Sequence, residues 1–360
     1  MTSRSAHGSV PPHERRAARV LVIGAGPVGL AAAARLAERG VPFTVLEAGD
    51  SPGASVRRWG HVRLFTTWRH DVDPAARRLL AAAGWAQPCV EKLPTGAALV
   101  EEYLRPLADL PALRPHVRYG ARVVAVRNAR PLGRHPGDGA VRLDDGTELP
   151  ATAVIDASGT WRTPNPLPVA SAVPVVEGAL PDVLGSDRER FAGRHTLVVG
   201  SGHSAATTLL ALVALRLKEP GTRVSWAIRA DSPARAYGVG REDPLPARGA
   251  LGTRLRGFVA SGAIDLHTGF TVAAMSTVDG RVAVSDGERT LDVDRVVNAT
   301  GYHADPGLTA GHTIGAKSGG PEFLLSTGYA QAAAAVATVA GGAVAGEEPV
   351  AWDACARSTG

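Results

Sequence analysis

The sequence predicts an α/β protein with two domains of the same three-layer design, in which two sheets and one layer of helices (ββα) repeat. Two glycine-rich turns carry this prediction, Gly24-Ala-Gly-Pro-Val-Gly29 and Gly200-Ser-Gly-His-Ser-Ala205. Each turn follows a short apolar run and precedes a helix-forming stretch, the context in which such a turn binds a dinucleotide. With 360 residues the chain is long enough for two domains, each with its own core.

The first unit begins with an apolar strand at 19–23, followed by the first glycine turn and a helix through 30–39. A second strand spans 43–47. A hairpin is indicated by Asp145-Gly146, and an apolar strand then leads into Gly159.

The second unit repeats this order. A strand at 196–199 leads into the second glycine turn, a helix covers 209–217, and a strand covers 223–229. Asp286-Gly287 indicates the hairpin, and the closing strand leads into Gly301. Matching order in both halves predicts two Rossmann-like units.

The chain order places the second domain inside the first. We expect a first domain of 19–165 and 302–350, a second of 190–301, and a proline-rich connection at 166–189. Residues 1–18 are expected to be a disordered leader. The alanine-rich stretch after Tyr329 is too short and too often interrupted for a membrane span, so we expect a buried helix there.

Several motifs resemble those of flavoproteins with two dinucleotide-binding domains. They are the first glycine turn with Glu47, the strand end Ala157-Ser-Gly-Thr-Trp161, the second glycine turn, and Asn298-Ala-Thr-Gly-Tyr302. Within that group the chain is similar to the flavin-containing monooxygenases, N-hydroxylases and Baeyer–Villiger enzymes. It shares longer stretches, such as Trp59 to Phe65, with bacterial flavoproteins of uncertain role.

The residue after the second strand of each unit indicates which nucleotide binds where. Glu47 can accept hydrogen bonds from ribose hydroxyls and would repel a 2′-phosphate. Arg229 ends the corresponding strand of the second unit, and a guanidinium suits a 2′-phosphate. We therefore expect FAD in the first unit and NADPH in the second.

The resemblance extends these assignments to a set of binding residues. For FAD it implies Gly24, Gly26, Gly29, Glu47, Arg58, Trp59, Gly159 and Thr327; for NADPH it implies Gly200, Gly202, His203, Ser204, Arg229 and Gly301. The candidates for the flavin face are His61, Arg63 and Trp68. Ser204 is a possible helix cap, and Thr327 is expected just before a helix whose positive N-terminus would face the flavin.

By the same resemblance, the expected reaction is oxygenation of a small molecule. Dioxygen would form a C4a-(hydro)peroxyflavin that passes one oxygen atom to nitrogen, sulfur or a carbonyl carbon. An F-x-G-x-x-x-H pattern typical of the group is absent, and the stretch between Tyr302 and Gly315 is short. Two alternatives remain: a flavin reductase, dehydrogenase or oxidase with another electron acceptor, and a non-catalytic nucleotide-binding redox sensor.

Composition argues against several other classes. The net charge of +5 comes from scattered arginines, with only three lysines and no dense basic run, so a nucleic-acid partner is not expected. Two distant cysteines and no C-x-x-C predict neither a dithiol centre nor a metal site. No signal peptide is recognised, so we expect a cytoplasmic protein without a membrane partner, with a homodimer possible.

Overall fold

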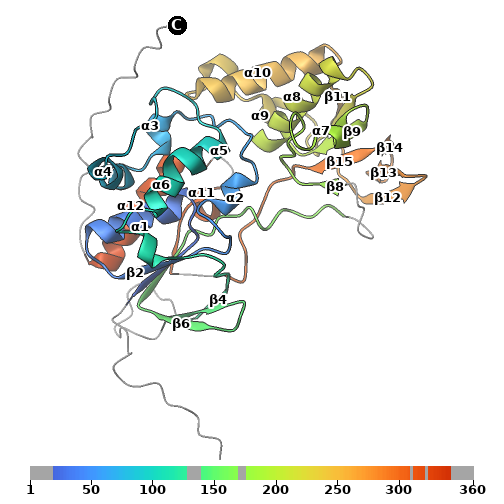
Figure 1. Ribbon diagram of the computed structural model, residues 1–360. Coiled ribbons are helices and arrows are strands. Elements are labelled where there is room, and N and C mark those ends of the chain that lie inside the picture. The colour runs from blue at the N-terminus through green and yellow to red at the C-terminus, as the bar shows by residue number, and fades with distance from the viewer. Residues whose placement is uncertain (1–18, 128–138, 169–175, 309–310, 321–322, 342–360) are drawn as a thin grey trace, which may run out of the picture.

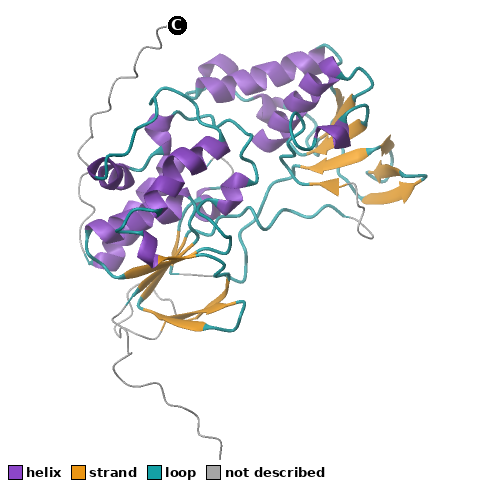
Figure 2. Cartoon of the chain, viewed as in Figure 1, coloured by secondary structure: helices purple, strands orange, loops and turns teal. Residues whose placement is uncertain are grey.

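The computed structural model describes residues 19–127, 139–168, 176–308, 311–320 and 323–341. The expected leader at 1–18 and the part of the first domain after residue 341 lie outside these residues. Two α/β units lie next to each other, connected by two extended segments (Figures 1 and 2). The predicted fold class is confirmed.

The first unit is built on a five-stranded parallel sheet. Its strands, in spatial order, are β16 (His312–Thr313), β7 (Ala153–Asp156), β1 (Val20–Ile23), β2 (Phe43–Leu46) and β3 (Val117–Arg118). A three-stranded antiparallel sheet covers one face, formed by β4 (Val123–Arg127), β5 (Gly139–Leu143) and β6 (Glu148–Ala151). Since β16 follows the whole second unit in the chain, the second unit is inserted into the first.

Helices cover the other face of this sheet (Figure 2). They are α1 (Pro27–Glu38), α2 (Ala54–Arg57), α3 (Trp68–Asp71), α4 (Pro74–Ala82), α5 (Gly96–Ala98), α6 (Arg105–Ala108), α11 (Ala316–Gly319) and α12 (Leu325–Ala340). A π-helix, η2 (Leu99–Leu104), links α5 to α6, and a short 3-10 helix, η3 (Arg114–His116), precedes β3.

The second unit repeats the arrangement with its own cores. Its parallel sheet has the order β11 (Asp265–His267), β10 (Arg223–Ala227), β9 (His195–Val199), β15 (Arg295–Asn298) and β8 (Val176–Glu177). The antiparallel sheet consists of β12 (Ala274–Val278), β13 (Arg281–Ser285) and β14 (Thr290–Val293). The helical layer holds α7 (Arg188–Phe191), α8 (His203–Lys218), α9 (Ala234–Tyr237), η4 (Gly240–Glu242) and α10 (Pro246–Ala260).

Alternating side chains of the central strands hold the three layers together. In β1, Val20 and Val22 pack in the core under the helices, whereas Leu21 and Ile23 pack against the antiparallel sheet. In β9, Val198 faces the helices and its neighbours face the other sheet. Both faces of each parallel sheet are covered, which explains why these strands are continuously apolar.

The two connecting segments are joined by hydrogen bonds around Asn165. Its amide Nδ2 donates to the carbonyl of Thr300 (3.0 Å), and its own carbonyl accepts from Nδ2 of Asn298 (2.8 Å). Beside them the rings of Trp161 and Tyr302 stack, with centroids 5.0 Å apart. The passage between the units is therefore a defined structure in its described part.

Two expected boundaries need correction. β8 pairs with β15, and Ala179 and Val183 are buried in the core of the second unit, so the second unit begins before residue 190. Residues 169–175 of the expected connection lie outside the described residues. α12 begins at Leu325, so Thr327 lies inside its first turn.

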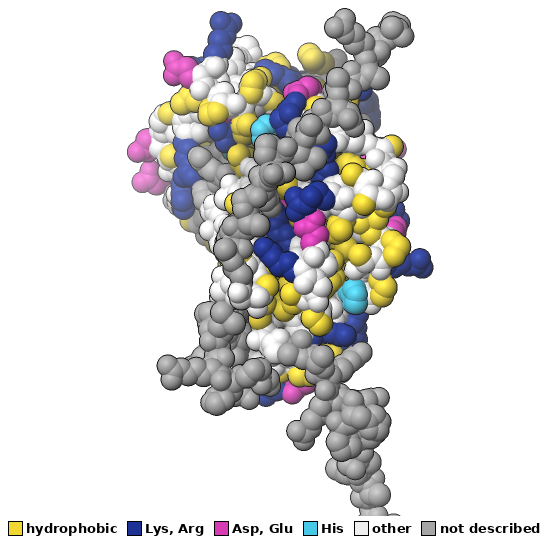
Figure 3. Space-filling model, turned by 90° about the vertical axis from the view of Figure 1, so that its left-hand side faces the viewer, with side chains coloured by type: hydrophobic (Ala, Val, Ile, Leu, Met, Phe, Trp, Pro, Cys, Tyr) yellow, Lys and Arg dark blue, Asp and Glu magenta, His cyan; other side chains and the backbone are white. Residues whose placement is uncertain are grey.

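The helix expected in the alanine-rich stretch is the buried α12. It packs along α1, and a Cβ on Gly328 would lie 2.5 Å from Cγ2 of Val28, which explains the glycine. In the described part of the chain, none of the helices combines the length and the apolar character needed to cross a membrane. Figure 3 shows that basic and acidic side chains are intermixed on the outer face of the first unit.

Replacing Gly29 by alanine is expected to destabilise the first unit. The new Cβ would lie 2.0 Å from the carbonyl oxygen of Gly24, so backbone must move, and overpacking of this kind costs roughly 1–3 kcal/mol. Gly26→Ala is the matched control, since a Cβ there meets no atom within 4 Å and φ is −78°. Thermal unfolding of the apoproteins should show a lower melting temperature for Gly29→Ala and not for Gly26→Ala. Equal melting temperatures of the two variants would contradict this packing.

Candidate functional site

The two glycine turns have the same geometry at their first glycine. Gly24 has φ of +99° and Gly200 has φ of +131°, both in the left-handed region. A Cβ would lie 2.8 Å from the carbonyl oxygen of Ala157 at the first position and 2.1 Å from that of Ala299 at the second. Each turn thus passes directly against the end of the neighbouring strand, which only glycine permits.

The second glycine of each turn faces open space. Gly26 and Gly202 are the N-cap residues of α1 and α8, and a Cβ on either would meet no atom within 4 Å. Neither helix has a side-chain hydrogen bond at its cap. Each N-terminus therefore presents free N–H groups and the positive end of the helix dipole, an arrangement that fits a pyrophosphate.

Glu47 is buried and holds the first turn against the end of β2. Its Oε2 accepts from the backbone N–H of Ala25 and its Oε1 from that of Gly49, both at 2.7 Å. Each carboxylate oxygen accepts more than one hydrogen bond, so ribose hydroxyls can be bound in addition. The arrangement fits the adenosine half of FAD.

The register of the second unit places a different residue at the position of Glu47. The N–H of Gly24 donates to Leu46 and that of Gly200 to Ala227, so Ile228 is the counterpart of Glu47. Ile228 is buried, and Arg229 follows as an exposed residue. We expected Arg229 at the position that corresponds to Glu47, but Arg229 lies one residue after it. The residue at that position, Ile228, is not a carboxylate.

Among the described residues, Arg229 makes no hydrogen bond or ion pair with the protein, so its guanidinium is available to a ligand. In contrast, the carboxylate of Asp243 is engaged by Nε of Arg248 at 2.8 Å. That hydrogen bond, opposed by burial, lowers the pKa of Asp243.

Arginines that the sequence did not single out lie near Glu47. Burial, together with the positive charges of Arg122 and Arg58, lowers the pKa of Arg162, while the charge of Glu47 opposes that shift. Arg58 was expected at this site; Arg122 and Arg162 were not. In a chain so rich in arginine, the sequence alone gives no signal that picks out these two.

Of the three flavin-face candidates, Arg63 and Trp68 line one cavity, and His61 is not among its lining residues. His61 is exposed; Arg63 is exposed and donates from Nη1 to the carbonyl of Leu93 (2.8 Å); Trp68 is only 3% exposed and packs in the first core. Trp59, expected to bind FAD, packs on Gly96, where a Cβ would lie 2.8 Å from the indole ring. Their roles toward the flavin stay predictions.

One ring contact joins this segment to the second unit. The ring of Phe65 meets that of His203 edge to face, with centroids 5.0 Å apart. His203 is the first residue of α8 and is exposed. Ser204 lies in the first turn of α8 and does not cap it, because the N-cap is Gly202. The start of α8 thus contacts the first unit.

The remaining candidates lie at the ends of β7, β15 and α12. Gly159 and Gly301 both have positive φ, +70° and +98°, two residues after the alanines that contact the glycine turns. Thr327 is exposed within the first turn of α12. Asp156, at the end of β7, forms a fully buried ion pair with Lys317, which also donates to the carbonyl of Leu308.

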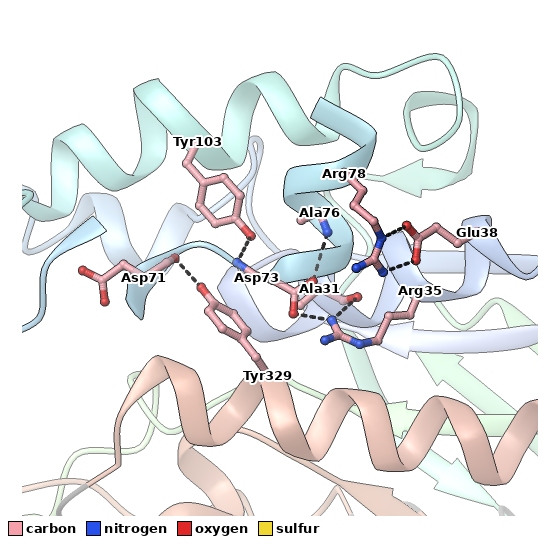
Figure 4. A network of polar contacts seen from close by, with 9 residues as sticks. All are labelled: Ala31, Arg35, Glu38, Asp71, Asp73, Ala76, Arg78, Tyr103 and Tyr329. Carbon is pink, nitrogen blue, oxygen red and sulfur yellow. Dashed lines mark hydrogen bonds and ion pairs between the residues drawn. The ribbon is translucent and has the colours of Figure 1, made fainter. Parts of the chain in front are cut away.

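Next to α12 lies a buried polar network, shown in Figure 4. The hydroxyl of Tyr329 donates to the carbonyl of Asp71 (2.6 Å), and the N–H of Asp73 donates to Tyr103 (3.1 Å). The carboxylate of Asp73 pairs with the buried Arg35.

Among the residues that the structure describes, no cationic side chain pairs with Asp71. Its Oδ1 accepts from Thr66, its Oδ2 is buried without a hydrogen-bond partner, and burial raises its pKa to about 7. Sequence analysis did not identify this carboxyl group, since only the fold brings α3 and α12 together.

A family model described as pyridine nucleotide-disulphide oxidoreductase matches residues 21–325. The chain belongs to this family. Rice (Oryza sativa subsp. japonica) indole-3-pyruvate monooxygenase YUCCA1 is 32% identical over 61% of this chain and 50% of its own length. A ferredoxin–NADP reductase from Rhodospirillum rubrum is 27% identical over 82% of this chain and 75% of its own length. The chain thus spans half to three quarters of these relatives.

Solved structures show the same fold. The bacillithiol disulfide reductase of Bacillus cereus superposes with a TM-score of 0.66 at 20% identity, covering 90% of this chain and 99% of that one. A flavin-containing monooxygenase from Stenotrophomonas maltophilia gives 0.60 at 20% identity, with the same coverage. The predicted resemblance is confirmed: the protein is a flavin-dependent oxidoreductase, and FAD and NADPH are its cofactors.

Asp71→Asn is expected to stabilise the protein increasingly as pH rises. The folded state holds the Asp71 proton up to about pH 7, whereas an unfolded carboxyl releases it near 3.8, so wild-type stability falls between those values. The full penalty is at most about 4 kcal/mol. Chemical unfolding at pH 5 and pH 8 should show a larger advantage of the variant at pH 8.

Asp73→Asn is the matched control for this prediction. It leaves Arg35 buried without its ion-pair partner and should destabilise at both pH values. An advantage of Asp71→Asn that is the same at pH 5 and pH 8 would show that Asp71 is not a neutral acid in the folded protein.

Proposed function

We propose that this protein is an NADPH-dependent flavin monooxygenase that oxygenates a small molecule. FAD is assigned to the first glycine turn and NADPH to the second. The observation that carries the nucleotide assignment is the contrast at one register position, where Glu47 follows β2 and the apolar Ile228, with Arg229 next to it, follows β10.

The residues of the chain bind and orient the two nucleotides in this proposal. The N-terminus of α1 receives the pyrophosphate of FAD, Glu47 binds its adenosine ribose, and Arg58 adds a positive charge nearby. The N-terminus of α8 receives the pyrophosphate of NADPH, and Arg229 pairs with the 2′-phosphate. Together the cofactors supply electron transfer from NADPH to the flavin and the reaction with dioxygen.

The choice of oxygen transfer as the final step is supported by relatives whose names describe monooxygenases, including the rice protein at 32% identity. The second candidate is a reductase that passes electrons to another acceptor. It is favoured by the ferredoxin–NADP reductase of Rhodospirillum rubrum, which aligns over a larger share of this chain. Both candidates use the same two nucleotide sites and differ only after the flavin has been reduced.

Reduction and reoxidation of the purified protein separate these candidates. The flavin is bleached anaerobically with NADPH, air is admitted, and absorbance and hydrogen peroxide are followed. For a monooxygenase we expect a blue-shifted absorbance that persists before the oxidised spectrum returns. Immediate reoxidation with stoichiometric peroxide, together with rapid reduction of an added electron acceptor, would favour the reductase and reject oxygen transfer.

Arg229→Ala is expected to weaken NADPH binding about tenfold or more and to leave NADH binding nearly unchanged. A charge-assisted hydrogen bond to phosphate contributes roughly 1.5–3 kcal/mol to the binding free energy. NADH has no 2′-phosphate, so its binding does not include this contact. Arg223→Ala is the matched control, since Arg223 is an exposed arginine at the opposite end of β10. Equilibrium titration of both coenzymes checks this; an equal loss for NADH would rule out the 2′-phosphate contact.

A further inference from the structure

The first unit contains a cavity of about 310 Å³ that none of the residues of the two glycine turns line. Its walls come from the segment around Arg63 and Trp68, from the segment 88–95, and from the start of the helices that follow. The residues that give the cavity its chemistry are Arg63, Trp68, Lys92, Leu93, Ala98 and Glu102.

Backbone hydrogen bonds hold the first two walls together. The N–H of Leu64 donates to Pro94 (2.9 Å), that of Gly96 to Val62 (2.9 Å), and that of Trp68 to Lys92 (3.1 Å). The two segments therefore run alongside each other and keep the cavity open without help from a ligand. Such a preformed site binds a ligand with little ordering cost.

The third wall includes an unusual helix. Ala98 precedes the π-helix Leu99–Leu104, and Glu102 lies within it. The indole N–H of Trp85 donates to the carbonyl of Glu102 (2.8 Å), which stabilises this wider turn. π-Helices are rare and occur frequently at functional sites, so this one is an observation independent of the cavity.

Charge and shape define what the cavity accepts. Arg63 uses Nη1 for the carbonyl of Leu93 (2.8 Å), which fixes its guanidinium and leaves its other N–H groups for a ligand. Lys92 adds a second positive charge, against the single carboxylate of Glu102. Trp68, Leu93 and Ala98 give the walls apolar surface.

We propose that this cavity binds a small organic carboxylate with an apolar or aromatic body. The carboxylate pairs with the guanidinium of Arg63 and with Lys92, and the body packs on Trp68 and Leu93. The volume corresponds to roughly ten water molecules, enough for an aryl or branched-chain acid. This site does not depend on the proposed function, because the acid is either a molecule that the enzyme oxidises or an effector that it only binds.

Calorimetric titration with phenylacetate tests the proposal, using phenylacetamide as the neutral molecule of the same shape. We expect phenylacetate to bind the wild-type protein at least tenfold more tightly than the amide. Arg63→Gln should weaken phenylacetate about tenfold, and Lys92→Gln should weaken it less. Arg69→Gln is the matched control, since Arg69 is a nearby arginine that pairs with Glu91 outside the cavity.

Flavin content and melting temperature are recorded for each variant to detect folding defects. If Arg63→Gln is misfolded, the affinity of Lys92→Gln for phenylacetate tests the proposal instead. No phenylacetate binding by the wild type, equal affinity for the amide, or unchanged binding in both cavity variants would overturn the proposal. Measuring the consumption of NADPH and of phenylacetate distinguishes a substrate from an effector. A substrate is consumed together with NADPH, whereas an effector binds and is not consumed.

Discussion

Both glycine turns depend on a backbone contact that is closer than any Cβ allows. In the first unit the contact is between Gly29 and the carbonyl of Gly24, and in the second the turn at Gly200 passes against Ala299. The N-termini of α1 and α8 begin at Gly26 and Gly202, where a Cβ would face open space. Because Gly26 and Gly202 carry no side chain, the N-termini of both helices are left open, which suits the binding of an anion.

The two units have the same fold but differ in the residues beside their glycine turns. The first has charged, buried groups beside its turn, with Glu47 bonded to the turn and Asp156 paired with Lys317. At the equivalent positions the second has Ile228 and Asn298, which carry no charge. Asn298 instead donates to the carbonyl of Asn165 and joins the second turn to the connection between the units. The contact between Phe65 and His203 adds a second junction close to the start of α8.

Sequence reasoning was most effective where local rules decide the structure. The strands, the hairpin turns and both glycine turns follow from apolar runs, turn residues and the need for positive φ at Gly24 and Gly200. The hydroxyl of Thr95, the N-cap residue of α5, likewise accepts from the N–H of Ala98, three residues on, at 3.1 Å. These features involve residues close together in the chain.

Features that depend on distant contacts were missed. Asp71 is far in sequence from α12, whose Tyr329 donates to the backbone carbonyl of Asp71. Arg122 and Arg162 likewise come together near Glu47 only in the folded unit. The one-residue shift from Ile228 to Arg229 follows from strand register, which is set by the pairing of β9 with β10. The early start of the second unit likewise required the pairing of β8 with β15.

We propose that each glycine turn binds its own nucleotide. Hydrogen exchange of backbone amides, measured by mass spectrometry on the apoprotein with FAD alone and then with NADP⁺ added, tests it directly. We expect FAD to slow exchange in peptides covering 24–30 and NADP⁺ to slow exchange in peptides covering 200–206. Protection of the same turn by both nucleotides, or the reverse assignment, would contradict it.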